Sequence, residues 1–319
     1  MEKITKISEF KKGENITIRG DIVVSEKIAN NGNKYKSLKI EDTSNIAYAN
    51  IFDNDKNFSL ITKEKFYGEI ECVVEAVKEA TNRYNTFNIL SIKECERNDV
   101  DNIVNIPELK EYLAKAIHDM KHPGYRQLLF NLFKREDIKG KFFEAPGSEK
   151  AGYSFRGGLL ARVVRLIKLS KAIKNVYDDI NFNLDDTNTK LNEDLLITAS
   201  IFTEIGRINQ LEFTSDKRIE KTDVGNLFDT EHISSKILFE ELQKVGGLLD
   251  EEEKLLLEHI SASTLGQVPS ATPEAFAYSL FSLLDKKLSN LEYVKRTSGK
   301  IDFAELFGRV MCLKQVEEI

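Results

Sequence analysis

The segment Ile201-Phe202-Thr203-Glu204-Ile205-Gly206-Arg207 organises the second half of the chain. It ends an apolar run that begins at Leu195 and predicts a buried helix. The run then changes to a polar residue, an acidic residue, a glycine and a base. In a helical metal-dependent hydrolase, a His-Asp pair at such a position would supply two adjacent metal ligands. Thr203-Glu204 offers a single carboxylate, so whether the chain is an enzyme depends largely on this pair.

The composition is that of a globular protein of about two domains. The chain has 319 residues, and domains of ~150 residues are typical. Hydrophobic residues (41%) suffice for a packed core, and charged residues (31%) indicate a soluble surface. The net charge of -6 provides no global attraction to nucleic acid, so a nucleic-acid site would have to be a local basic patch.

Cysteine use and hydropathy indicate a reducing, cytoplasmic environment. Cys72, Cys95 and Cys312 are widely spaced and form no CxxC motif, which argues against a disulfide framework or a zinc knuckle. The first residues contain no apolar signal region. No apolar run approaches the ~18 residues that a membrane span needs, so no membrane association is expected.

Residues 1–98 show the alternation typical of β-strands. Ile16, Ile18, Ile22 and Val24 share one face of a strand whose other face is mostly polar. Five strands in under about 100 residues, with a longer connection before the fourth, favour a small OB-type β-barrel, and an SH3-like barrel is the main alternative. Besides the strand at 16–24, the predicted strands cover residues 35–41 (Leu38 and Ile40 inward), 46–52, 66–77 and 86–92.

The apolar period becomes helical from Pro107 onward. The fold class is therefore α+β with two domains: a β-barrel at 1–98, a linker at 99–107 and an all-α domain at 108–319. A charged loop is expected from Thr214 to Asn226, and Thr230 is the expected N-cap of the helix that follows. After a first helix at about 107–120, helices are expected at 125–133, 158–173, 191–202, 230–245, 250–262 and 273–291.

Short motifs occur in a shared order along nearly the whole chain. They are Asn31–Lys34, Glu41–Ser44, Ile51–Asp53, Met120–Pro123, Phe142–Pro146, Gly158–Val163, Ile201–Arg207, Gly225–Leu227, Glu231–Ser234, Leu257–Ile260 and Leu283–Leu288. This order resembles the YhaM family of 3′→5′ exoribonucleases, which combine an N-terminal OB-fold with a helical HD domain. The resemblance implies an HD-like fold for the helical domain and a homo-oligomer.

The resemblance also implies where a metal site would lie, and most of its ligands are replaced. The family's first His corresponds to Arg162, and its closing Asp to Ser282. His232 is kept, Asp285 matches a second family acid, and Arg207 matches a family Lys. The His-Asp and His-His pairs correspond to Thr203-Glu204 and Thr264-Leu265.

Two remaining ligand types, His232 and Glu204, cannot close a site that needs several imidazoles and a carboxylate. Arg162 would add a permanent positive charge where the metal charge should be. The expected helical domain is therefore a pseudo-HD domain with a vestigial pocket, no catalytic residues and no metal. One hypothesis is that Arg162 replaces the metal as the cation of the pocket and pairs with Glu204. The alternative is that Arg162 faces solvent with Arg165 and Lys168.

An OB barrel typically binds single-stranded nucleic acid through exposed aromatic side chains, which stack on the nucleobases, and basic side chains, which contact the phosphates. Turn residues near lysines and arginines suit such a surface, and the alternative is that most of the aromatic residues are core. A second basic stripe comprises Arg156, Arg162, Arg165 and Lys168, for which a solvated helix face is the alternative. The candidate nucleic-acid-binding residues of the barrel are Arg19, Lys34, Tyr35, Lys36, Tyr48, Phe52, Arg83, Tyr84 and Phe87.

These patterns predict a catalytically inactive YhaM-like protein that binds single-stranded RNA or DNA, or that serves as a scaffold or regulatory subunit for a protein partner. The first alternative is a 3′→5′ exoribonuclease or HD phosphohydrolase with an atypical site, which would use Mn²⁺ or another divalent metal. The second is an oligomeric structural protein that does not bind nucleic acid.

Overall fold

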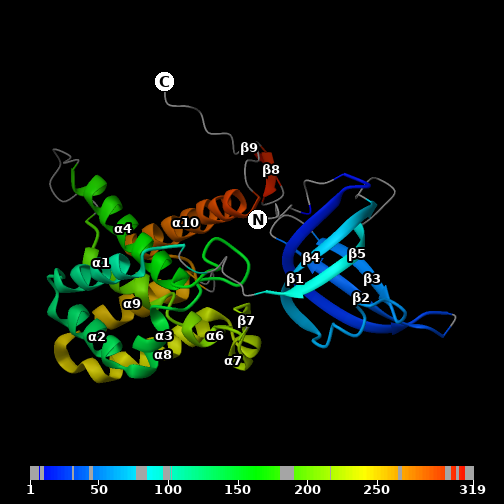
Figure 1. The fold of residues 1–319 in the computed structure, drawn as a ribbon. Helices are drawn as coiled ribbons and strands as arrows, with labels where there is room; N and C mark the ends of the chain where they lie inside the picture. The colour runs from blue at the N-terminus through cyan, green and yellow to red at the C-terminus, as the bar shows by residue number, and fades with distance from the viewer. Residues whose placement is uncertain are drawn as a thin grey trace. The chain divides into compact units, whose positions relative to one another are not determined.

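The computed structural model describes residues 7, 11–30, 32–42, 46–76, 85–95, 101, 103–179, 190–215, 217–264, 268–298, 303–306 and 309–312. The fold is α+β, with a five-stranded sheet followed by a mostly helical region (Figure 1). The chain forms two compact units. One comprises residues 99–293, and the other comprises residues 1–98 together with 294–319. Each unit is described by itself.

The first unit contains a strongly coiled sheet in the order β1-β2-β3-β5-β4. The long strand β1 pairs in antiparallel fashion with β2 through its second half and with β4 through its first half. β2 pairs with β3 and β4 with β5, again antiparallel, and β3 makes a short parallel contact with β5 at Ala47 and Tyr48. The strands are β1 (Asn15–Ile28), β2 (Lys34–Glu41), β3 (Ile46–Phe52), β4 (Lys65–Ala76) and β5 (Asn85–Glu94).

Alternation of apolar and polar residues determines which face of this sheet is buried. Ile18, Ile22, Leu38 and Ile40 are at most 1% exposed, which confirms the predicted inward faces of the first two strands. Val24 is also buried, at the point where β1 has passed from β4 to β2 as its main partner. Burial of these β-branched and leucine side chains is the main driving force for coiling the sheet around one core.

Within the described residues, the second unit packs ten helices and a small hairpin around one large apolar core, with a small separate cluster at Tyr153 and Phe155. Its hairpin consists of β6 (Leu211–Phe213) and β7 (Ile219–Lys221). The helices are α1 (Ile106–His118), α2 (Pro123–Lys134), α3 (Glu136–Phe142), α4 (Gly158–Asp179), α5 (Glu193–Phe202), α6 (Arg207–Gln210), α7 (Asp223–Leu227), α8 (Thr230–Val245), α9 (Glu251–Thr264) and α10 (Pro273–Ser298), with a 3₁₀ turn at Gly246–Leu248.

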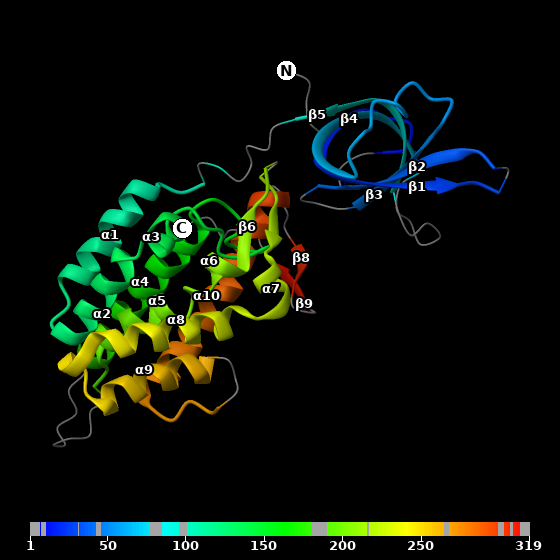
Figure 2. The same ribbon diagram turned by 90° about the horizontal axis from the view of Figure 1, so that it is seen from below.

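Helix α5 is the centre of this unit. Every residue from Asp194 to Phe202 is buried, as the apolar run in the sequence predicts. Asn192 caps its start by accepting a hydrogen bond from the backbone N–H of Leu195 at 3.0 Å. The helix contacts α2, α4, α8 and α9, and α8 and α9 run side by side in Figure 2. These four neighbouring helices fix the position of α5 and therefore the point at which Thr203 and Glu204 leave it.

Several expectations for this region are wrong in detail. Asp229, not Thr230, caps α8, because its carboxylate accepts a hydrogen bond from the backbone N–H of His232 at 2.8 Å. The segment 214–226, expected to be a loop, contains β7 and the start of α7. Two short strands, β8 (Phe303–Leu306) and β9 (Arg309–Cys312), form a hairpin after the last helix, where only helix was expected. No helix in the described part of the chain is long and apolar enough to cross a membrane.

Candidate functional site

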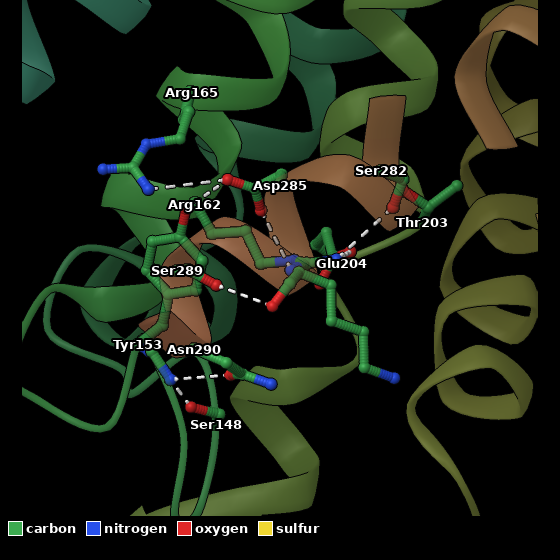
Figure 3. A network of polar contacts seen from close by, with 12 residues as sticks. Ser148, Tyr153, Arg162, Arg165, Thr203, Glu204, Ser282, Asp285, Ser289 and Asn290 are labelled. Carbon is green, nitrogen blue, oxygen red and sulfur yellow. Dashed lines mark hydrogen bonds and ion pairs between the residues drawn. The ribbon is translucent and has the colours of Figure 1, made fainter. Parts of the chain in front are cut away.

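Arg162 lies at the centre of a buried polar cluster in the helical unit. It projects from α4 and is only 7% exposed. Its Nη2 atom lies 2.8 Å from Glu204 Oε1, and its Nη1 atom lies 3.1 Å from Asp285 Oδ2 (Figure 3). One guanidinium thus joins Glu204, two residues beyond the end of α5, to the middle of α10. The predicted Arg162–Glu204 pair is confirmed, and the solvent-facing alternative for Arg162 is wrong.

Glu204 is held as a carboxylate by two arginines. Besides its contact with Arg162, its Oε2 atom lies 2.8 Å from Nε of Arg207, the first residue of α6. Burial opposes ionisation of Glu204, but the charges and hydrogen bonds of Arg162 and Arg207 outweigh it and lower its pKa to about 2. Glu204 is therefore fully ionised at neutral pH, and both of its oxygen atoms are engaged.

Asp285 is the second carboxylate of the cluster. Its Oδ1 atom accepts a hydrogen bond from the hydroxyl of Tyr153 at 2.6 Å and lies 3.6 Å from Arg165 Nη1. Burial raises the pKa of Asp285, although the charge of Arg162 and the Tyr153 hydroxyl act in the opposite direction. In Figure 3 the side chains of Arg162, Arg165 and Tyr153 converge on this carboxylate. Three arginines in all therefore surround two carboxylates.

The turn between α5 and α6 is fixed by small residues and hydroxyl groups. The Thr203 hydroxyl bonds to the carbonyl of Ala199 at 2.8 Å and to the hydroxyl of Tyr278 on α10. Gly206 packs so closely on α8 that an added Cβ would lie 2.1 Å from the Thr230 carbonyl oxygen. This packing sets the direction in which the Glu204 side chain enters the cluster.

The other residues of the predicted vestigial pocket are divided between the cluster and the surface. Ser282 accepts a hydrogen bond from Arg162 Nη2 at 3.4 Å. His232 is exposed and stacks on Phe228, with ring centroids 4.7 Å apart. The Thr264 hydroxyl donates to the carbonyl of Ile260 at 2.7 Å, and Leu265 lies outside the described residues.

The cluster does not have the ligand set of a metal centre. Its two carboxylates are engaged by guanidinium groups, and His232 instead lines a groove whose walls include Phe228 and Lys236 but neither Arg162 nor Glu204. Within the described part of the chain, no three His, Cys, Asp or Glu side chains gather as metal ligands. The chemistry available at Arg162 is charge pairing and hydrogen bonding.

The face of β2 and β3 that points away from the core carries three of the predicted aromatic residues of the sheet. We call Tyr35, Lys39, Tyr48 and Phe52 the β2–β3 face. Tyr35 and Phe52 are cross-strand partners with ring centroids 5.6 Å apart, and Phe52 is 47% exposed. Tyr48 lies opposite Lys39, whose Nζ atom lies 2.9 Å from Glu41 Oε2, and Lys27 of β1 lies opposite Tyr35. Aromatic and basic side chains are therefore adjacent on this surface.

Two predicted nucleic-acid-binding residues belong to the core instead. Lys36 is 8% exposed and donates hydrogen bonds to the carbonyls of Phe58 and Ile61 at 2.8 and 2.7 Å. Phe87 is 3% exposed. Lys36 has the same parity along β2 as the inward-facing Leu38, so the period of the strand could have indicated its burial.

The remaining candidates differ in their surroundings. Arg19 is exposed on the surface of β1 and pairs with Glu69, and Lys34 is exposed at the start of β2. Arg83 and Tyr84 lie outside the described residues.

The predicted basic stripe of the helical unit is not a free cationic face. Arg156 pairs with Asp101 at 2.9 Å and with Glu144 at 3.1 Å. Arg165 pairs with Glu292 at 2.9 Å, and Lys168 lies over the ring of Tyr112. A comparison with known protein families finds none whose profile matches the chain.

Proposed function

We propose that this protein binds single-stranded nucleic acid through the β2–β3 face and that its helical unit is a non-catalytic scaffold. The observation that carries the proposal is the buried Arg162, which is paired with Glu204 and Asp285. In the YhaM family, which the sequence resembles, the corresponding positions belong to the metal site of an exonuclease. Here they hold an arginine and its ion-pair partners, so we propose a non-catalytic role for the helical unit.

The strand order of the first unit supports an OB-type interpretation. In an OB fold, a five-stranded, partly open barrel binds oligonucleotides over strands 2 and 3 and the loops beside them. The aromatic pair Tyr35 and Phe52 lies on those strands. Tyr48 continues the same face, Lys39 beside it is paired with Glu41, and Lys27 extends the face onto β1. Stacking of bases on aromatic rings and pairing of phosphates with lysines need no particular sequence.

The helical unit fits an internal cation better than a metal. A guanidinium is planar, permanently charged and able to contact two carboxylates at once. Arg162 uses that geometry, since its two Nη atoms contact different carboxylates. A divalent ion between Glu204 and Asp285 would have to displace Arg162 and would then lack imidazole ligands. We therefore derive no catalytic step at this cluster and assign it the role of joining α4, α5 and α10.

Fluorescence anisotropy with a labelled single-stranded oligonucleotide tests the binding role. Tyr35→Ala and Phe52→Ala should each weaken binding about tenfold, because one stacked base contributes ~1–3 kcal/mol. Phe239→Ala is the matched control, since Phe239 is a 58% exposed aromatic residue on α8 of the other unit. Affinity should fall as salt rises, because phosphate contacts release counterions. Equal affinity in all three variants, or no binding by the wild type at low salt, would refute the binding role.

A further inference from the structure

Helix α10 carries an apolar stripe on the side opposite the buried cluster. Ser282 and Asp285 of this helix are buried, whereas five large apolar side chains on its other side are between 48% and 59% exposed. These five residues, which we call the α10 stripe, are Phe276, Leu280, Leu283, Leu284 and Leu288. Phe276, Leu280, Leu284 and Leu288 follow one another every four residues, and Leu283 lies three residues after Leu280, so all five fall on one face of the helix.

The stripe is large for a monomer. Five half-exposed side chains of this size present about 400 Å² of apolar surface, whereas monomeric proteins rarely expose contiguous apolar patches above a few hundred Å². A standard-size interface buries about 800 Å² on each partner, of which roughly 450–520 Å² is apolar. The stripe could supply most of the apolar part of one such interface.

We propose that the α10 stripe is a two-fold interface with a second copy of this chain, formed by antiparallel packing of the two α10 helices. The reason for choosing a second copy is the symmetry of four of the five stripe residues. Phe276, Leu280, Leu284 and Leu288 are evenly spaced about position 282. An antiparallel two-fold axis at that position places Leu280 opposite Leu284, and Phe276 opposite Leu288. A two-fold interface requires such a self-complementary surface.

Charge also favours the antiparallel arrangement. A parallel pair would place Lys287 of one copy beside Lys287 of the other, which is a repulsive contact. The antiparallel pair places Lys287 opposite Ala277 instead, so the two lysines are kept apart. Because the stripe is on the opposite side of α10 from Asp285, changes in it leave the Arg162 cluster intact. The interface does not depend on the proposed nucleic-acid binding.

Two charged double variants of the full-length chain test this geometry. In Leu280→Lys/Leu284→Lys, the antiparallel axis places lysine opposite lysine in both contacts, and the dimer should dissociate. In Leu280→Lys/Leu284→Glu, the same axis places lysine opposite glutamate, so this variant should remain the tighter dimer by at least about tenfold. Sedimentation equilibrium gives the dissociation constant of each variant. Leu255→Glu on α9 is the control, because Leu255 is 63% exposed outside the stripe.

The expected result is a dimeric wild type, a dimeric Leu255→Glu variant and a clear difference between the two double variants. Far-UV circular dichroism should be the same for all four proteins, because every substituted residue is exposed. A monomeric wild type would overturn the proposal and leave another part of the chain, or a different protein, as the occupant of the stripe. Equal dissociation constants for the two double variants would overturn the antiparallel contact.

Discussion

Replacing Arg162 by methionine should strongly destabilise the helical unit. The change removes the cation between Glu204 and Asp285, whose side chains are 5% and 0% exposed. At an effective dielectric constant of about 20, each opposite charge about 4 Å away contributes ~4 kcal/mol of attraction. Part of this attraction is offset by the cost of burying Arg162. Removal of one partner from a buried ion pair typically costs ~3–5 kcal/mol, because a buried charge is left uncompensated.

Urea unfolding of the full-length protein, followed by far-UV circular dichroism of the helices, measures this loss. In a thermal unfolding experiment on a unit of this size, a loss of ~3–5 kcal/mol corresponds to a decrease in Tm of roughly 10 °C. Arg165→Met is the matched control on the same helix. Arg165 is 40% exposed and lies 3.6 Å from Asp285, so its replacement should cost under about 1 kcal/mol.

A second substitution separates charge from packing. Glu204→Gln in the Arg162→Met background removes the carboxylate that lost its Arg162 partner. The double variant should therefore be more stable than Arg162→Met alone. If Arg162→Met stays within about 1 kcal/mol of the wild type, the ion pairs do not hold the three helices together. If the double variant is less stable than Arg162→Met, the loss arises from packing and the charge argument is wrong.

Two further predictions concern the same turn. The Glu204 pKa is lowered from 4.5 to about 2, so its ionised form stabilises the fold above about pH 4.5, and this contribution is lost as pH falls toward 2. Acid unfolding of Glu204→Gln should therefore depend less on pH in that window, and an unchanged slope would contradict the pairing. Gly206→Ala should lower the free energy of unfolding by about 1–3 kcal/mol, because its Cβ would collide with the Thr230 carbonyl; wild-type stability in urea would contradict this contact.

The sequence predicts the strands of the five-stranded sheet well because their period is local. Alternating apolar residues such as Ile16, Ile18 and Leu38 all turn inward, and the predicted third strand matches β3 residue for residue. The hairpin of β6 and β7 is not predictable in this way, because residues 211–221 have no sustained apolar alternation. Its formation depends on contacts with the rest of the helical unit.

The Arg162–Glu204 contact could be predicted because the family resemblance assigns both positions to one pocket. The contact between Tyr153 and Asp285 could not, since 132 residues separate them and Tyr153 lies in an irregular segment before α4. The exposure of His232 could not be predicted from the sequence either, because which side of α8 faces solvent depends on how the helix packs.

A strand-processing assay tests the central claim of a non-catalytic, nucleic-acid-binding protein most directly. The full-length protein is incubated with a 3′-labelled single strand and Mn²⁺, and both bound and shortened strands are measured. We predict salt-sensitive binding without shortening, since Arg162 engages both Glu204 and Asp285. Shortening that is lost on His232→Ala or Glu204→Gln would contradict the account and establish a working nuclease site.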